Sequence, residues 1–136
     1  YLFDNYVDTL KQNVVVFKKI AYPYVLSAWS TDVWNIETGE LKHLPLKQEK
    51  FYYDSLTRWV ASSFEIKDAV LVNNEELRLL LYIDNTYCIK DIRLHDMQFV
   101  HEKELYIPQK RQSGVYFYGT DKLLYMSEEK LLMLYI

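Results

Sequence analysis

The chain has few residues of the types that build disulfide frameworks or flexible loops. Of its 136 residues, one is Cys and three are Gly. The single cysteine, Cys88, excludes an intramolecular disulfide and any metal site made of cysteines alone. A reducing compartment is the default for such a chain, so we expect an intracellular protein, cytoplasmic or nuclear.

Long apolar runs and clusters of positive charge are also missing. No apolar run approaches the ~20 residues that a membrane-spanning helix needs, and no signal-peptide pattern is visible. The net charge is −3 and both signs are mixed along the chain, so there is no electrostatic footprint for a nucleic acid. We therefore expect neither a membrane nor a nucleic acid as partner. Because the chain opens on Tyr1 rather than Met, we expect it to be a piece of a longer protein.

Catalytic and metal-binding patterns are missing as well. The sequence has no Gly-rich phosphate loop, no G-x-S-x-G and no H-E-x-x-H. His43, His95 and His101 lack the spacing of a helical zinc site, and we expect them to face solvent or to be satisfied by neighbours. Cys88 lies in an apolar stretch and is interpreted as a small core residue. These patterns predict a protein that is not an enzyme and that has no cofactor and no metal.

The residues that are abundant favour strands. Half of the chain is hydrophobic and 16% is aromatic, including 13 Tyr, and such side chains suit a pleated sheet. Short apolar stretches separated by polar turns predict an all-β fold of short antiparallel strands. Residues 47–57 are polar with an aromatic cluster and are predicted to form a long loop. Strands are expected at 14–17, 24–29, 33–36, 41–46, 66–72, 77–83, 99–107, 115–118, 123–126 and 131–136, with 77–83 as a central strand.

The first twelve residues are the exception to the strand pattern. Leu2, Phe3, Tyr6, Val7 and Leu10 recur at intervals of three and four residues, which predicts one face of a short amphipathic helix. We therefore divide the chain into an N-terminal helix over 1–12 and a single antiparallel β domain over 13–136. The helix is expected to lie on the core of that domain or to connect it to a partner.

Three segments repeat one scheme of strand, polar turn and strand: 24–36, 79–94 and 123–136. Leu26, Leu80 and Leu124 are taken as equivalent points in the three segments. Their spacing is close to the period of roughly 40–50 residues that β-propeller blades show. The scheme predicts two to three propeller-blade-like sheets that form an incomplete ring, so a partner chain is expected to complete the sheet.

The stretch VLSAWSTDVWNIETGEL, residues 25–41, resembles the core of a WD40 repeat. Ser27 matches the serine that ends one strand of that repeat, and Val33-Trp34-Asn35 matches Val-Trp-Asp at the end of the next. Asn35 stands where Asp is usual, and the turn between the two strands is shorter than in the family. Gly39 matches the following Thr-Gly turn. The resemblance implies a propeller that scaffolds other proteins, with structural roles for Ser27, Trp34 and Gly39.

The alternative fold is a single β-barrel or β-sandwich that carries one helix. It would be a compact domain that binds a small ligand or catalyses within a cavity. The function that we expect first is a non-enzymatic protein–protein interaction module or a scaffold subunit of a larger complex. Aromatic residues anchor many protein interfaces, so the predicted partner-binding residues are the aromatics in or beside turns: Tyr22, Tyr24, Phe51, Tyr52, Tyr53 and Trp59.

Overall fold

The computed structural model describes residues 6–8, 13–15, 17–27, 30–46, 48–52, 58–62, 64–107, 114–127 and 129–136. All regular structure in these ranges is antiparallel β-sheet, so the predicted all-β class is confirmed. The described ranges contain no helix, and thus none long and apolar enough to span a membrane. Within the same ranges, no sheet closes into a barrel and the sheets form no closed propeller.

The first sheet is a four-stranded meander in which each strand pairs with the next. The turn after its third strand is closed by Asn35, whose side-chain Oδ1 accepts hydrogen bonds from the backbone N–H groups of Glu37 and Thr38 at 3.0 and 3.2 Å. Gly39 then takes φ = 78°, which glycine adopts without strain. The strands are β3 (Phe17–Ala21), β4 (Tyr24–Ser27), β5 (Asp32–Asn35) and β6 (Leu41–His43).

The middle sheet is a second four-stranded meander with longer strands. Its two central strands are joined by a two-residue turn, Asp84-Asn85, in which both residues have positive φ. Turns of this kind match the twist of a hairpin and fix its register. The strands are β9 (Phe64–Leu71), β10 (Glu76–Ile83), β11 (Thr86–Arg93) and β12 (Gln98–Leu105).

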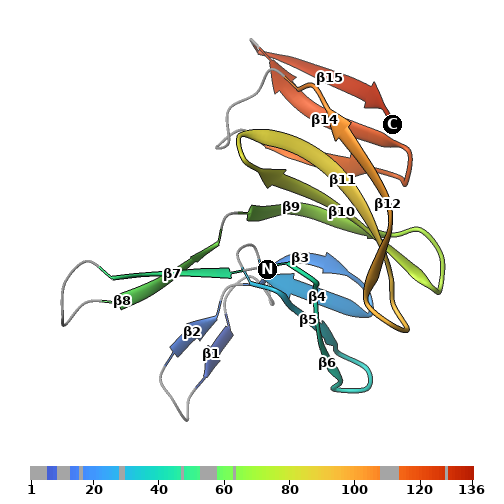
Figure 1. Ribbon diagram of the computed structural model, residues 1–136. Coiled ribbons are helices and arrows are strands. Elements are labelled where there is room, and N and C mark those ends of the chain that lie inside the picture. The colour runs from blue at the N-terminus through green and yellow to red at the C-terminus, as the bar shows by residue number, and fades with distance from the viewer. Residues whose placement is uncertain are drawn as a thin grey trace.

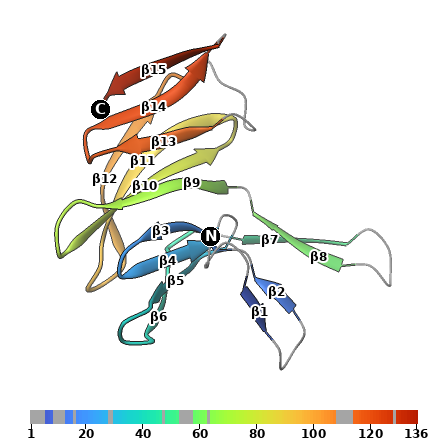
Figure 2. The same cartoon turned by 180° about the vertical axis from the view of Figure 1, so that it is seen from behind.

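The third sheet has three strands, β13 (Val115–Tyr118), β14 (Lys122–Ser127) and β15 (Lys130–Tyr135). Two separate hairpins complete the described structure. Figures 1 and 2 show that one of them, β7–β8, projects away from the three sheets. The hairpins are β1 (Tyr6–Asp8) with β2 (Asn13–Val15), and β7 (Gln48–Tyr52) with β8 (Arg58–Ser62).

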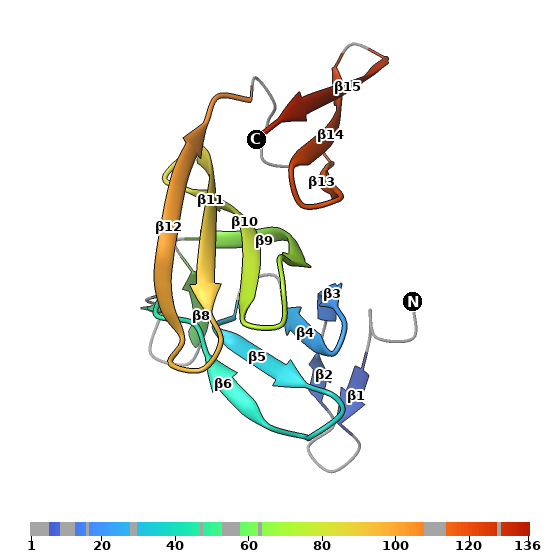
Figure 3. The same ribbon diagram turned by 90° about the vertical axis from the view of Figure 1, so that its right-hand side faces the viewer.

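The three larger sheets are stacked in chain order, with the middle sheet between the other two (Figures 1 and 2). Their first strands lie side by side, since β9 contacts both β3 and β13, and Figure 3 shows the same arrangement from the side. Two apolar interfaces hold the stack together. The first contains Leu26, Val33, Phe64, Leu79 and Leu81 among others, and the second contains Leu80, Tyr87, Ile89, Val115 and Leu123.

The two central strands of the middle sheet, β10 and β11, are therefore largely buried on both faces. Along β10, Leu79 and Leu81 point into the first interface and Leu80 points into the second, and all three are fully buried. A strand with two covered faces is expected to be continuously apolar rather than alternating. This explains the leucines at 77 and 79–81 and confirms the prediction that 77–83 is a central strand.

The repeat proposed from the sequence coincides with the topology. Leu26, Leu80 and Leu124 lie on β4, β10 and β14, and each of these is the second strand of its sheet. The three repeated segments correspond to the second and third strands of the three sheets.

Three sequence predictions are corrected. The helix over 1–12 is wrong where the structure describes it, because Tyr6–Asp8 is strand β1 paired with β2; the remaining residues of that range lie outside the described residues. The long loop over 47–57 is wrong for Gln48–Tyr52, which is β7. The first strand of the first sheet is Phe17–Ala21 rather than 14–17, because its ladder with β4 begins at Phe17.

The second interface gives the first prediction. Replacing Leu80 by Ala should lower the free energy of unfolding by about 2–5 kcal/mol, because it removes buried methyl groups and leaves a cavity. Replacing the exposed Tyr106 by Ala should change it by less than about 0.5 kcal/mol. Urea unfolding followed by circular dichroism measures both. Equal effects would show that Leu80 is not in a packed interface.

Candidate functional site

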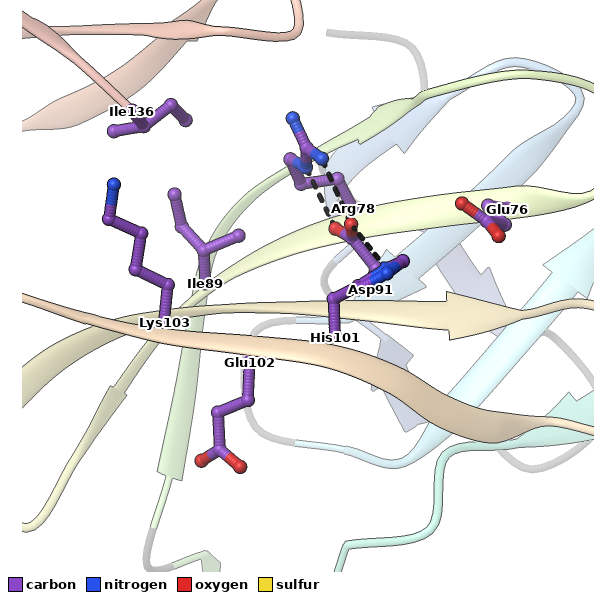
Figure 4. Close-up of a pocket in the computed structure, with 8 residues that line it drawn as sticks. All are labelled: Glu76, Arg78, Ile89, Asp91, His101, Glu102, Lys103 and Ile136. Carbon is purple, nitrogen blue, oxygen red and sulfur yellow. Dashed lines mark hydrogen bonds and ion pairs between the residues drawn. The ribbon is translucent and has the colours of Figure 1, made fainter.

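A cleft of about 300 Å³, lined mostly by charged or titratable residues, opens where the middle sheet meets the third sheet (Figure 4). Most of its side chains come from three adjacent strands, β10, β11 and β12. Figure 4 shows Arg78, Asp91 and His101 pointing toward one another across these strands. The lining residues are Glu76, Arg78, Ile89, Asp91, His101, Glu102, Lys103 and Ile136.

Arg78 and Asp91 form a bidentate ion pair at the centre of the cleft. They are register partners on β10 and β11, and Arg78 Nε and Nη2 donate to Asp91 Oδ1 and Oδ2 at 2.7 and 2.9 Å. Asp91 is only 3% exposed, so its charge needs a close partner to offset desolvation. The hydrogen bonds to Asp91 in turn raise the pKa of Arg78.

Two hydrogen bonds cross from the middle sheet to the third sheet beside this pair. Arg78 Nη1 donates to the carbonyl oxygen of Thr120, in the turn between β13 and β14. On β9, Asp68 Oδ2 accepts a hydrogen bond from the backbone N–H of Phe117 at 2.7 Å. The middle sheet thus contributes one donor and one acceptor that fix the position of the third sheet.

His101 extends the Arg78–Asp91 pair into a row across three strands, since it is the register partner of Asp91 on β12. Its Nδ1 lies 3.6 Å from Asp91 Oδ2. The ligand atoms of Glu76, Asp91 and His101 lie within 4.8 Å of one another, and oxygen and nitrogen ligands of this kind bind divalent metals. However, both Asp91 oxygens accept hydrogen bonds from Arg78, whose charge repels a cation. The arrangement therefore suits an internal charge pair better than a metal ion.

The predictions for the other titratable candidates are confirmed. His43, His95 and His101 are all exposed, and each lies near a carboxylate. Cys88 is buried in the first interface, and burial raises the pKa of its thiol. A thiol that is held protonated in an apolar core is a weak nucleophile.

The aromatic residues predicted to bind a partner are distributed over two places. Tyr22 is exposed and donates from its hydroxyl to Glu37 Oε2 at 2.6 Å, and this hydrogen bond raises the pKa of Tyr22. Tyr24 is half-buried and packs against the first interface. On the β7–β8 hairpin, Phe51 is the register partner of Trp59 and Tyr52 of Arg58. Tyr53 lies outside the described residues. A role for these residues in partner binding stays a prediction.

The three residues given structural roles all lie on the first sheet. Ser27 ends β4, and Trp34 on β5 is the register partner of both Val25 and Leu41. Both Ser27 and Trp34 are half-buried. Gly39 forms the predicted turn, where its N–H donates to the backbone oxygen of Asn35 at 2.7 Å.

Sequence reasoning missed the outward face of the third sheet, which points away from the middle sheet. Tyr116, Leu124 and Met133 are consecutive register partners across its three strands. On β15, Leu131, Met133 and Tyr135 are 65%, 45% and 69% exposed. The signal was present: 131–136 is a continuous apolar run, the pattern of a strand that is covered on both faces.

Comparisons with known proteins assign no relative to this chain. No protein-family model matches it, and neither the curated proteins nor the solved structures contain a match. The WD40 resemblance therefore rests on residues 24–41 and has no support from a family match.

The buried ion pair gives the second prediction. Replacing Arg78 by Met leaves the Asp91 charge buried without its partner, which should cost about 3–5 kcal/mol of stability. The double variant Arg78→Met/Asp91→Leu should recover most of that loss, since no buried charge then remains. Urea unfolding of the wild type, both single variants and the double variant tests this. A double variant no more stable than Arg78→Met would contradict it.

Tyr87, in the second interface, gives a prediction of pH dependence. Burial raises the pKa of Tyr87 to about 12. Between about pH 10 and 12 the unfolded chain loses this proton and the folded chain keeps it, so stability should fall as pH rises.

The matched variant is Tyr87→Phe, which has no proton to lose. From about pH 8 to about pH 11, the wild type should lose about 1–1.5 kcal/mol more stability than Tyr87→Phe. Parallel urea unfolding at the two pH values measures the difference. Identical pH profiles would show that Tyr87 ionises equally well in both states.

Proposed function

We propose that this chain is a non-enzymatic protein–protein interaction module, or a scaffold subunit of a larger complex, that is built from propeller-like sheets. It binds other proteins through the outward face of its third sheet. The observation that carries this proposal is the apolar character of that face, on which Leu131, Met133 and Tyr135 are largely exposed. Exposed apolar patches of this kind typically mark interaction sites.

The order of the strands supports the propeller-like architecture. Each sheet is a meander of consecutive strands, and the first strands, β3, β9 and β13, lie side by side. These strands start at Phe17, Phe64 and Val115, so the unit repeats at roughly the 40–50-residue period of propeller blades. Ser27 ends the second strand of the first sheet and Trp34-Asn35 ends the third. These are the positions that the WD40 resemblance implies.

A comparison of the sheets supports the assignment of the binding face. Both faces of β10 and β11 in the middle sheet are covered, one by the first sheet and one by the third. The third sheet carries apolar side chains on both faces, with Lys122 between Tyr118 and Tyr135 on the outward one, but only one face is covered within the described structure. Its outward face carries Tyr116, Tyr118 and Met133, and Tyr and Met are enriched at protein interfaces. A protein surface that covers this face would complete the pattern of the middle sheet.

The alternative, a domain that binds a ligand within a cavity, is supported by one observation. His101 and a buried carboxylate, Asp91, both line the cleft. That carboxylate is already neutralised by Arg78, and Arg78 also holds the third sheet through Thr120. The cleft side chains are therefore engaged in joining two sheets, which favours the interaction module.

Cross-linking in the cells that make the protein tests the proposal. With an amine-reactive reagent, cross-links to other proteins should concentrate at Lys122 and Lys130 on the third sheet rather than at Lys42 on β6 or Lys103 on β12. The variant Leu131→Ser/Met133→Ser should lose most of these cross-links, because it removes apolar area from the outward face.

The matched control is Gln98→Ser, a change at an exposed residue of β12 in the middle sheet that removes no lysine and should leave the pattern unchanged. Cross-links spread evenly over the lysines, or retained in the double serine variant, would refute binding through the outward face.

A further inference from the structure

Strand β15 forms an open edge of the third sheet, distinct from the outward face. In the described structure, β15 pairs with β14 and with no strand on its other side. Figures 1 and 2 show it at the upper margin of the stack. The strands at the same position in the other sheets, β5 and β11, are each paired on both sides, with β6 and β12 respectively.

The fourth strands of the other two sheets, β6 and β12, form edges that are protected against pairing, whereas the edge formed by β15 is not. Proteins protect edge strands with short length, charged side chains or bulges. Strand β6 has three residues, and β12 carries Glu102, Lys103 and Glu104 together with a bulge against β11. Strand β15 has six residues, and its only charge is at its first residue, Lys130. Its ladder with β14 runs without a register shift.

The backbone groups on this edge can be assigned from the ladder. The Ile136 N–H donates to the carbonyl oxygen of Asp121 at 2.8 Å, so this pair marks a hydrogen-bonded position of the ladder. In an antiparallel ladder such pairs alternate, so the N–H and C=O groups of Leu132 and Leu134 point toward β14. The N–H and C=O groups of Leu131, Met133 and Tyr135 therefore point to the open edge. Three donors and three acceptors are thus available there.

We propose that β15 pairs with β15 of a second copy of this chain, antiparallel, about a two-fold axis at Met133. In this register Met133 faces Met133 of the second copy, and Leu131 faces Tyr135 in both directions. These are the residues whose backbone groups point outward, so every pair can exchange hydrogen bonds. The two three-stranded sheets become one sheet of six strands.

The side chains agree with this register. Leu132 of one copy lies opposite Leu134 of the other, so each side chain from 131 to 135 meets an apolar side chain. Lys130 lies opposite Ile136, which keeps the two lysines apart. The strand is therefore complementary to itself in shape and charge, and a two-fold interface requires that property. The outward face stays open, so this pairing does not depend on the proposed function.

Sedimentation of the purified chain tests the pairing. The wild type should sediment with twice the mass of the 16.4 kDa chain. Met133→Pro should raise the dissociation constant at least about tenfold, because it removes an outward N–H without breaking the ladder to β14. Met133→Leu keeps that N–H and should remain dimeric. A wild type that stays monomeric up to its solubility limit would overturn the proposal.

A second experiment fixes the register and does not depend on the proline variant. In a Cys88→Ala background, Met133→Cys places two cysteines opposite each other with Cα atoms about 5.5 Å apart, which permits a disulfide. Oxidation should yield a covalent dimer from Met133→Cys and at least about tenfold less from Leu132→Cys, whose partner is Leu134.

The outcomes separate this proposal from the preceding one. Equal disulfide yields from the two cysteine variants would refute the two-fold register at Met133. A monomeric chain that still cross-links to other proteins at Lys122 and Lys130 would refute self-pairing and leave the interaction module intact. A dimer that forms no such cross-links would refute the interaction module and leave self-pairing intact.

Discussion

The two central strands of the middle sheet, β10 and β11, carry apolar side chains on both faces, and strands of that kind are stable in water only if both faces are covered. The rest of the described structure follows from this constraint. One face, which includes Leu79 and Leu81, is covered by the first sheet, and the other, which includes Leu80, is covered by the third. Strands β10 and β11 therefore each contribute side chains to two interfaces, which explains why both strands are rich in aliphatic residues.

Apolar contact alone does not fix how one sheet lies on another, because it is non-directional. Polar contacts supply that direction between the middle and third sheets. The Asp68 carboxylate accepts a hydrogen bond from the backbone N–H of Phe117. Arg78, which is ion-paired with Asp91, donates a hydrogen bond to the carbonyl oxygen of Thr120. The cleft around Arg78 is thus part of the joint between two sheets. The same constraint, applied to the third sheet, is the basis of our two proposals, that other protein surfaces cover its outward face and its β15 edge.

Much of the fold could be predicted from local patterns. The nearly continuous apolar run over 77–83 predicted a central strand, and Leu26, Leu80 and Leu124, taken as equivalent points of a repeat, all lie on the second strand of their sheets. Two predictions were wrong for a physical reason. Over 1–12, spacing of three and four residues fits a helix, but Tyr6–Asp8 gains its hydrogen bonds from β2. Over 47–57, polar composition suggested a loop, although pairing with β8 makes Gln48–Tyr52 a strand.

The candidate site was harder to predict because it depends on register. Arg78 and Asp91 are far apart in sequence but equidistant from the Asp84-Asn85 turn, so they become partners only once that two-residue turn is recognised. Asp68 and Phe117 belong to different sheets, and no local pattern connects them. The exposure of β15 could not be foreseen from composition, since its sequence matches that of a buried strand.

The exchange rate of the Phe117 amide proton tests most directly whether the third sheet is held on the middle sheet as described. By the alternation of the β13–β14 ladder, this N–H points away from β14, and its acceptor is Asp68 on β9. NMR-detected hydrogen exchange should show a protected Phe117 amide that becomes unprotected in Asp68→Ala. Rapid exchange of this amide in the wild type would contradict the packing of the two sheets.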